Sequence, residues 1–115
     1  MALAASEKEK ALAKMQRYCL YQDRCHIEVR RKLLQQKVYG DDLEEIMAAL
    51  VEDDFLNEER FARSFARGKF RIKQWGRLRI KRELKARQIS DYCIRKSMTE
   101  IEEEDYLDTA QEVAD

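Results

Sequence analysis

Residues 60–87 concentrate the side chains that could do chemistry, because twelve lysines and arginines stand there against a single acid, Glu83. Arginine binds carboxylates and phosphates through paired hydrogen bonds, and lysine binds them as a point charge. The net charge of the chain is zero, because residues 40–59 and 100–115 hold nine and eight acids and no base. Charges sorted in this way create a strong local field. The pattern indicates that residues 60–87, the basic segment, bind an acidic protein surface or a nucleic-acid backbone.

The candidate binding residues lie on two predicted helices and on the link between them. On the helix after Asn57, the arginines form a stripe opposite the apolar positions Phe61, Phe65 and Ile72. Phe70 falls on the polar side and is a candidate exposed aromatic contact. The candidates for binding a partner or nucleic acid are Arg60, Arg63, Arg67, Phe70, Arg71, Lys73, Trp75, Arg77, Arg79, Arg82 and Lys85.

Alternative interpretations stay open for this segment. Trp75-Gly76 marks the break between the helices, and we favour a core or hinge tryptophan beside a glycine that permits a tight turn. The alternative is an exposed ring that stacks on a base or on a partner. The bases could instead form a solvated face that the acidic helix 41–54 neutralises by packing beside it. A weaker hypothesis gives the acidic blocks a role as a nucleic-acid decoy.

Catalysis and metal binding have little support in the residue types. The chain holds one histidine and no glycine-rich phosphate loop, and its carboxylates lie in solvated helical runs. Cys19, Cys25, His26 and Cys93 do not have the close-paired spacing of structural zinc sites. Cys19 and Cys93 are predicted to be small apolar core residues. We therefore expect no enzyme activity, no cofactor and no metal.

The sequence also predicts a cytoplasmic protein. It has no apolar run of about 20 residues that could span a bilayer. Met1 to Ser6 is too short an apolar stretch for a secretory signal. Three cysteines, an odd number without a regular framework, indicate reduced thiols.

Helices are predicted for almost the whole chain. Proline is absent and glycine occurs three times, which disfavours a β-sandwich or barrel. The predicted helices cover about 6–22, 23–36, 41–54, 57–74, 78–87, 90–101 and 102–115. Their predicted N-terminal capping residues are Ser6, Asp23, Asp41, Asn57 and Ser90.

These helices repeat along the chain. A shift of 51 residues superimposes seven apolar pairs. The pairs are Ile27 with Leu78, Val29 with Ile80, Leu33 with Leu84, Val38 with Ile89, Leu43 with Ile94, Met47 with Met98, and Leu50 with Ile101. The first helix fits less well, since Ala11 and Met15 match Phe61 and Phe65 only at a shift of 50. We predict an all-α protein of tandem three-helix units at 6–54 and 55–101, with 102–115 the first helix of an incomplete third, in an elongated and curved array.

Several segments resemble the RecX family. Residues 28–33, Glu-Val-Arg-Arg-Lys-Leu, are similar to the family's E-L-x-x-K-L signature, and residues 55–62 are similar to its L-[DN]-[DE]-E-R-F-A segment. Trp75-Gly76, residues 80–84 and Ile89-Ser90 resemble the stretch that follows in the family. The likeness extends over roughly residues 11–113.

The resemblance implies three tandem three-helix repeats, of which this chain would carry two and the start of the third. It implies a regulator that binds in the groove of the RecA filament. There the basic segment would meet acidic RecA surface or the phosphates of the bound single-stranded DNA, and we expect the protein to act as a monomer. Filament growth, ATPase activity and coprotease activity would be lowered, without a cofactor or a catalytic residue. The chain departs from the family at Cys25, commonly serine, and at Lys37 and Gln88, where a glycine would form a left-handed helix cap. Whether that cap survives stays open.

Two other classes of function fit the residues. One is a stand-alone helical nucleic-acid-binding module, which would bind DNA without RecA and with a steep dependence on salt. The other is a structural interaction domain that dimerises through the unfinished third unit.

Overall fold

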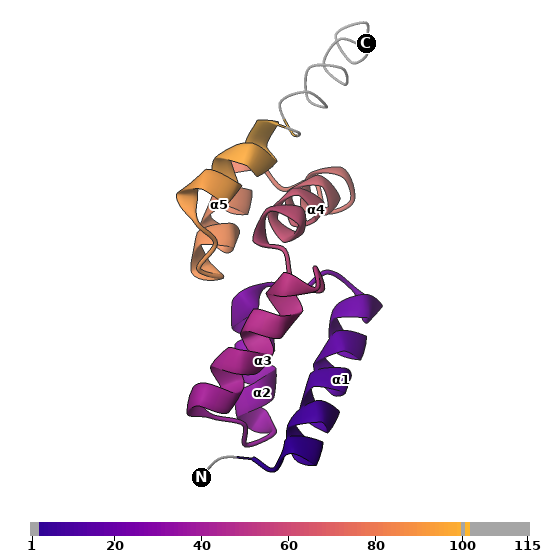
Figure 1. Ribbon diagram of the computed structural model, residues 1–115. Coiled ribbons are helices and arrows are strands. Elements are labelled where there is room, and N and C mark those ends of the chain that lie inside the picture. The colour runs from indigo at the N-terminus through magenta and orange to yellow at the C-terminus, as the bar shows by residue number, and fades with distance from the viewer. Residues whose placement is uncertain (1–2, 100, 102–115) are drawn as a thin grey trace, which may run out of the picture. The chain divides into compact units, whose positions relative to one another are not determined.

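The computed structural model describes residues 3–99 and 101, and every regular element among them is a helix (Figure 1). The labelled helices are α1 (Ala5–Tyr21), α2 (His26–Gln35), α3 (Gly40–Glu52), α4 (Glu58–Arg71) and α5 (Arg77–Ala86), and residues 91–99 are also helical. The predicted all-α class is confirmed. The predicted start of a third repeat, 102–115, lies outside the described residues.

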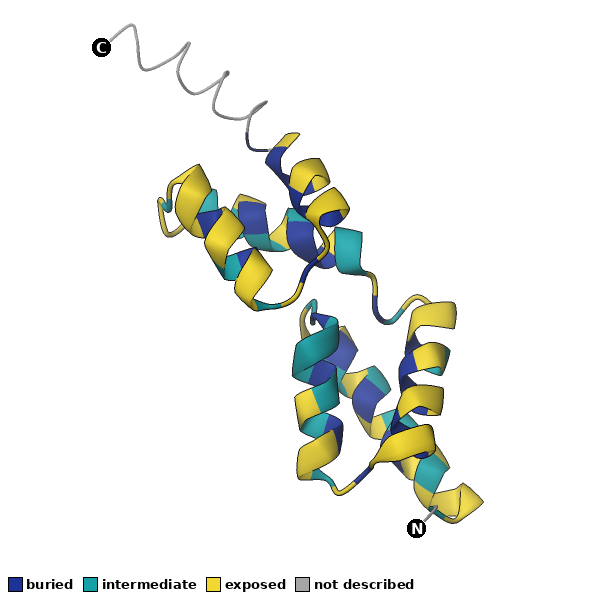
Figure 2. Ribbon diagram, turned by 90° about the vertical axis from the view of Figure 1, so that its left-hand side faces the viewer, coloured by how far each residue is buried: buried dark blue, intermediate teal, exposed yellow. Residues whose placement is uncertain are grey.

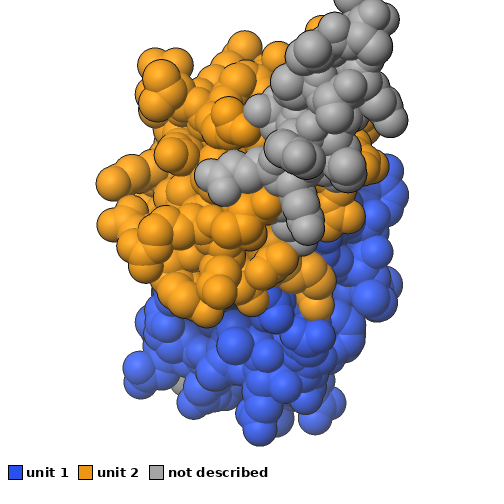
Figure 3. Space-filling model, turned by 90° about the horizontal axis from the view of Figure 1, so that it is seen from above, with its two compact units in different colours: residues 1–57 blue, residues 58–115 orange. Residues whose placement is uncertain are grey.

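The chain divides into two compact units, Met1–Asn57 and Glu58–Asp115 (Figure 3). We call them unit 1 and unit 2. In unit 1, helices α1, α2 and α3 each contact the other two, and in unit 2, α4 packs against α5. Two predictions remain untested: the limits of the repeat units and the elongated, curved shape of the array. The predicted limits are 6–54, 55–101 and 102–115.

Unit 1 is held together by one apolar stripe from each helix, visible as the dark blue positions in Figure 2. These side chains recur every three or four residues and so lie on one side of their helix. Burying a side chain as large as leucine contributes about 1.5–3 kcal/mol. The buried helical positions are Ala11, Met15 and Cys19 on α1, Val29 and Leu33 on α2, and Leu43, Ile46, Met47 and Leu50 on α3.

Unit 2 buries the corresponding stripes, with two corrections to the predicted core. Ile72 and Leu78 are 79% and 76% exposed. Ile72 lies one residue beyond the end of α4, where helical periodicity no longer sets its direction. Leu78 lies two residues before the buried Ile80, and this spacing places it on the opposite side of α5.

Burial confirms the internal repeat and corrects its first helix. In six of the seven predicted pairs both members are buried, and the exception is half-buried Ile27 with exposed Leu78. In the first helix, Ala11 and Met15 match the buried Ala62 and Ala66 at a shift of 51, the same as in the rest of the repeat. The shift of 50 was wrong because it aligned Ala11 and Met15 with the large apolar residues Phe61 and Phe65. The small residues Ala62 and Ala66 are the ones at the corresponding buried positions.

The left-handed helix caps survive without glycine. Lys37 and Gln88 have φ angles of 62° and 60°. Behind Lys37, the Val38 amide donates to the Leu33 carbonyl at 3.0 Å, and behind Gln88 the Ile89 amide donates to the Leu84 carbonyl at 3.2 Å. This is the hydrogen bond of a Schellman cap, and the buried side chain after each left-handed residue completes it.

The helix starts agree only in part with the predicted caps. Ser90 accepts a hydrogen bond from the Cys93 amide at 3.2 Å, and Asn57 directly precedes α4, as expected. The predictions at the other three positions were wrong, because α1, α2 and α3 are preceded by Ala4, Cys25 and Tyr39.

Cys25 is the clearest of the unexpected caps. Its amide and its thiol both donate to the Glu28 carboxylate, at 3.3 Å and 3.2 Å. The bond from the Cys25 amide is one half of a capping box, and the Cys25 side chain completes the box by accepting from the Glu28 amide, as a hydroxyl usually does. Cys25 and Gly76, which precede α2 and α5, also correspond at the shift of 51.

Candidate partner-binding surface

The apolar stripe of α4 decides where its arginines point. Phe61, Ala62 and Ala66 are buried, so the bases on the rest of the helix face outward. The exposed candidates on α4 are Arg60, Arg67 and Arg71, and Arg63 is half-buried. The predicted stripe of arginines is therefore present on the surface of unit 2.

The second half of the basic segment is also outward-facing. Ile80 and Leu84 are fully buried on α5. The exposed candidates in this part are Lys73, Arg77, Arg79, Arg82 and Lys85. Phe70 differs from its prediction as an exposed contact, because it is half-buried. It follows Ala62 and Ala66 at intervals of four residues, which extends the buried stripe.

Trp75 lies at the centre of a cluster of cations and aromatic rings. The guanidinium carbon of Arg79 lies 3.9 Å from the centre of the indole ring, and the Lys69 ammonium lies 4.9 Å from it. The Phe65 ring meets the indole edge-on, with 6.2 Å between ring centres. The Trp75 amide also donates to the Lys69 carbonyl at 3.0 Å. These contacts hold the half-buried indole at the corner between α4 and α5 and favour the hinge interpretation over base stacking.

The sequence did not single out two members of this cluster. Lys69 contacts both Phe65 and Trp75, and its position four residues after Phe65 on α4 was a signal that could have shown the first contact. Arg87 lies 4.7 Å from the centre of the Phe65 ring, although it follows the last residue of α5. No sequence spacing indicates that contact, because it depends on how α5 packs on α4.

The few acids near the basic segment form ion pairs at or near the surface of unit 2. Arg87 bonds Glu83 at 3.1 Å, and Lys85 lies 3.5 Å from Asp91. Such surface pairs contribute about 0–1 kcal/mol and are screened by salt. Arg79, Lys81 and Arg82 make no ion pair with any residue that the structure describes. Their charge is therefore available to an anionic partner.

Acids of α3 are paired within their own unit. Lys8 lies 3.5 Å from Asp42 and also pairs with Glu45. The Glu44 carboxylate forms a bidentate ion pair with the Arg30 guanidinium. This pairing raises the pKa of Arg30 and lowers the pKa of Glu44. Three acids of α3 therefore have partners within unit 1.

The described residues offer little other chemistry. Within residues 3–99 and 101, no three histidine, cysteine, aspartate or glutamate side chains gather as a metal site would require. All three cysteines are free and buried, which confirms the core prediction for Cys19 and Cys93. Among the same residues, every helix is too short or too polar to cross a bilayer.

The fold and the exposed bases define a class: small all-α proteins built from three-helix repeats, with a basic surface on the second repeat. A family model described as "RecX, second three-helix domain" matches residues 57–98. Residues 57–98 therefore match the RecX family, as the sequence motifs indicated.

Curated proteins and solved structures that carry the RecX name are also similar to this chain. The chain is 29% identical over 99 residues to "Regulatory protein RecX" of Lactococcus lactis subsp. cremoris (strain MG1363), covering 84% of this chain and 37% of that protein. It is 27% identical over 104 residues to the protein of the same name from Bacillus thuringiensis (strain Al Hakam), covering 90% and 38%.

A solved structure, "Crystal structure of RecX from Lactobacillus salivarius", is similar with a TM-score of 0.76 at 26% identity, covering 84% of this chain and 62% of that one. Another, "Crystal structure of regulatory protein RecX", gives a TM-score of 0.78 at 23% identity, covering 84% and 48%. The chain spans little more than a third of the length of the two curated relatives, which are named as regulatory proteins and not as enzymes.

Proposed function

We propose that this chain is a regulatory protein that binds the RecA–single-stranded-DNA filament and inhibits filament growth, ATPase activity and coprotease activity. The observation that carries the proposal is the overlap of two independent features. The RecX match spans residues 57–98, and the exposed bases of the basic segment lie within it. The protein would act as a monomer in the cytoplasm.

The proposed mechanism uses the bases of α4 and α5. They meet acidic recombinase surface or the phosphates of the bound strand, which guanidinium groups hold through paired hydrogen bonds. By bridging neighbouring RecA protomers along the filament groove, the protein opposes the addition of new ones and restricts the motion that ATP turnover needs.

The test is the single-stranded-DNA-dependent ATPase of RecA, measured while the protein is titrated in. The double variant Lys81→Glu/Arg82→Glu reverses two exposed charges that have no described ion pair. Arg31→Glu is the control in unit 1, because Arg31 is exposed and corresponds to Arg82 of unit 2 at the shift of 51. We expect the double variant to lose inhibition at unchanged helicity, and the control to keep it. Equal inhibition by both variants would remove the basic segment from the mechanism.

A second candidate, a stand-alone nucleic-acid-binding module, is favoured by the unpaired charges of Arg79, Lys81 and Arg82. Binding to the same DNA without RecA distinguishes it, because phosphate contacts release counterions and make affinity fall steeply with salt. Tight, salt-sensitive DNA binding without ATPase inhibition would support this candidate against the filament regulator.

A further inference from the structure

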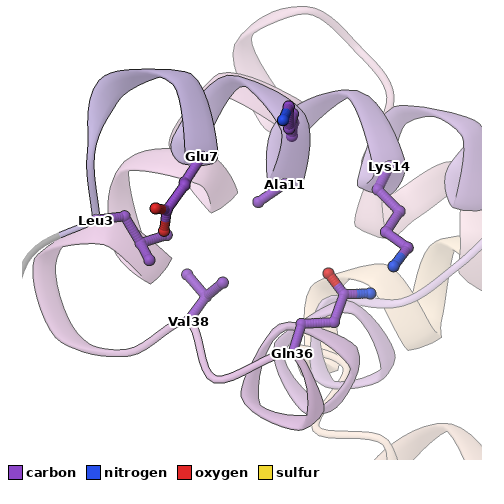
Figure 4. A pocket seen from close by; sticks show the side chains of 7 residues that line it. Leu3, Glu7, Ala11, Lys14, Gln36 and Val38 are labelled. Atoms are coloured by element: carbon purple, nitrogen blue, oxygen red, sulfur yellow. The ribbon is translucent and has the colours of Figure 1, made fainter.

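Unit 1 has an open groove between α1 and the connection from α2 to α3 (Figure 4). Its volume is about 280 Å³. Ala11 and Val38 are buried and half-buried Leu3 lies beside them, so these residues give the groove an apolar floor. Exposed Lys10 and Lys14 lie on its rim.

The rim is polar and unevenly charged. In Figure 4, Lys14 and Gln36 face each other across one end of the groove, and Glu7 lies with Leu3 at the other end. Neither Lys10 nor Lys14 makes an ion pair with any residue that the structure describes. The end of the groove at Lys14 is therefore suited to a negatively charged group.

The internal repeat shows what fills the same place in unit 2. At the shift of 51, Lys10 and Lys14 correspond to Phe61 and Phe65, and Gln36 corresponds to Arg87. The two phenylalanine rings have centres 5.7 Å apart, and Phe61 is only 6% exposed. The Phe65 ring in turn contacts the Arg87 guanidinium. Unit 2 thus places its own aromatic ring between the first helix and the end of the second.

Contacts inside each unit support this correspondence. In unit 1 the Arg24 guanidinium lies 3.8 Å from the centre of the Tyr18 ring. In unit 2 the corresponding positions are Lys69 and Trp75, which are also in contact. The cation and the aromatic ring have exchanged positions, but the pair is kept. The shift of 51 therefore holds along the first helix, where the groove residues lie.

We propose that the groove of unit 1 binds an aromatic side chain from an acidic segment of a partner protein. The aromatic ring takes the place that Phe65 occupies in unit 2, over the apolar floor of Ala11 and Val38. Carboxylates beside that ring meet Lys10 and Lys14, while Glu7 disfavours acids at the other end. This is recognition of a short peptide by one apolar anchor with a charged rim.

The test uses the full chain and a synthetic fluorescein-labelled peptide with one central phenylalanine flanked by aspartate and glutamate. A second peptide has alanine in place of the phenylalanine. Fluorescence polarisation should show binding of the phenylalanine peptide that is at least about tenfold tighter, and high salt should weaken it. Equal affinity for the two peptides would overturn the proposal, because a ring in the groove should distinguish them.

Two variants of the protein locate the site. Lys10→Phe/Lys14→Phe should fill the groove as unit 2 does and weaken peptide binding about tenfold or more. Lys10→Gln/Lys14→Gln removes the same charges but leaves the groove open, so it should keep the preference for phenylalanine over alanine and lose most of the salt dependence. Undiminished binding by the phenylalanine variant would overturn the assignment.

A measurement on the unmodified protein covers the case in which the phenylalanine variant does not fold. In amide NMR spectra, the phenylalanine peptide should shift the signals of Ala11 and Val38 more than those of α4 and α5. Shifts confined to α4 and α5 would place the peptide on the basic segment and overturn the proposal. None of these assays contains RecA, so their outcome is independent of the proposed filament function.

Discussion

Replacing Lys37 or Gln88 by glycine should stabilise the unit that contains it. Both residues hold the left-handed conformation, with φ angles of 62° and 60°. A residue with a Cβ atom costs roughly 1–2 kcal/mol there, whereas glycine does not. Glycine also loses about 0.5–1 kcal/mol more chain entropy on folding than alanine does. The difference predicts that each substitution raises the free energy of unfolding by about 0.5–1 kcal/mol.

Urea denaturation can follow the two units separately. Trp75 is the only tryptophan and lies in unit 2, so its fluorescence reports the effect of Gln88→Gly. Amide hydrogen exchange of the buried residues of unit 1 reports the effect of Lys37→Gly. We expect the effects to add in the double variant, because the two sites lie in different units.

Gln36→Gly is the matched control, because Gln36 precedes Lys37 and has a φ of −91°. Glycine gains no relief from strain at a negative φ, so this variant should lower the free energy of unfolding by about 0.5–1 kcal/mol. If Lys37→Gly is no more stable than Gln36→Gly, the left-handed conformation of Lys37 is not strained and the reasoning fails.

Three further predictions concern other contacts. Cys25→Ser should keep the capping box before α2, whereas Cys25→Ala should lower the free energy of unfolding by about 1 kcal/mol in urea denaturation; equal stability of the two would contradict the thiol cap. The contact with Arg30 lowers the pKa of Glu44 below its ordinary 4.5, so its contribution is present at neutral pH and is lost as the pH falls through the folded-state pKa. Acid titrations should therefore show a shallower loss of stability for Glu44→Gln, and an unchanged slope would count against the pair. Trp75→Ala should lower the free energy of unfolding of unit 2 by about 1–2 kcal/mol through lost cation–aromatic contacts, whereas Trp75→Phe should lose less in thermal denaturation.

The helices and their repeat could be predicted from the sequence because both depend on local spacing. Leu43, Ile46, Met47 and Leu50 are all buried on α3, as their helical spacing predicted. The same periodicity placed the bases of α4 and α5 outward, since a helix that buries one side exposes the other. Their binding role stays a proposal, because exposure does not identify a partner.

Helix ends were harder to predict, because a capping residue is defined by the chain that precedes it. Ser6 has the right type for a cap, yet α1 begins at Ala5. The chain before α1 is held by a residue far away in the sequence, since the Leu3 amide donates to the Asp42 carboxylate at 2.7 Å. Ile72 illustrates the same limit, because it continues an apolar pattern after its helix has ended.

Sequence alone determined the all-α class, the shift of 51 between the repeats and the position of the basic segment, because residue type and helical spacing are enough for each. Tertiary structure decided that Phe65 meets Arg87 in unit 2 and that the corresponding groove of unit 1 is open. The contact and the open groove both depend on how the end of one helix packs against another helix. Residues that meet in this way lie on different helices, so the periodicity within one helix does not predict their contact.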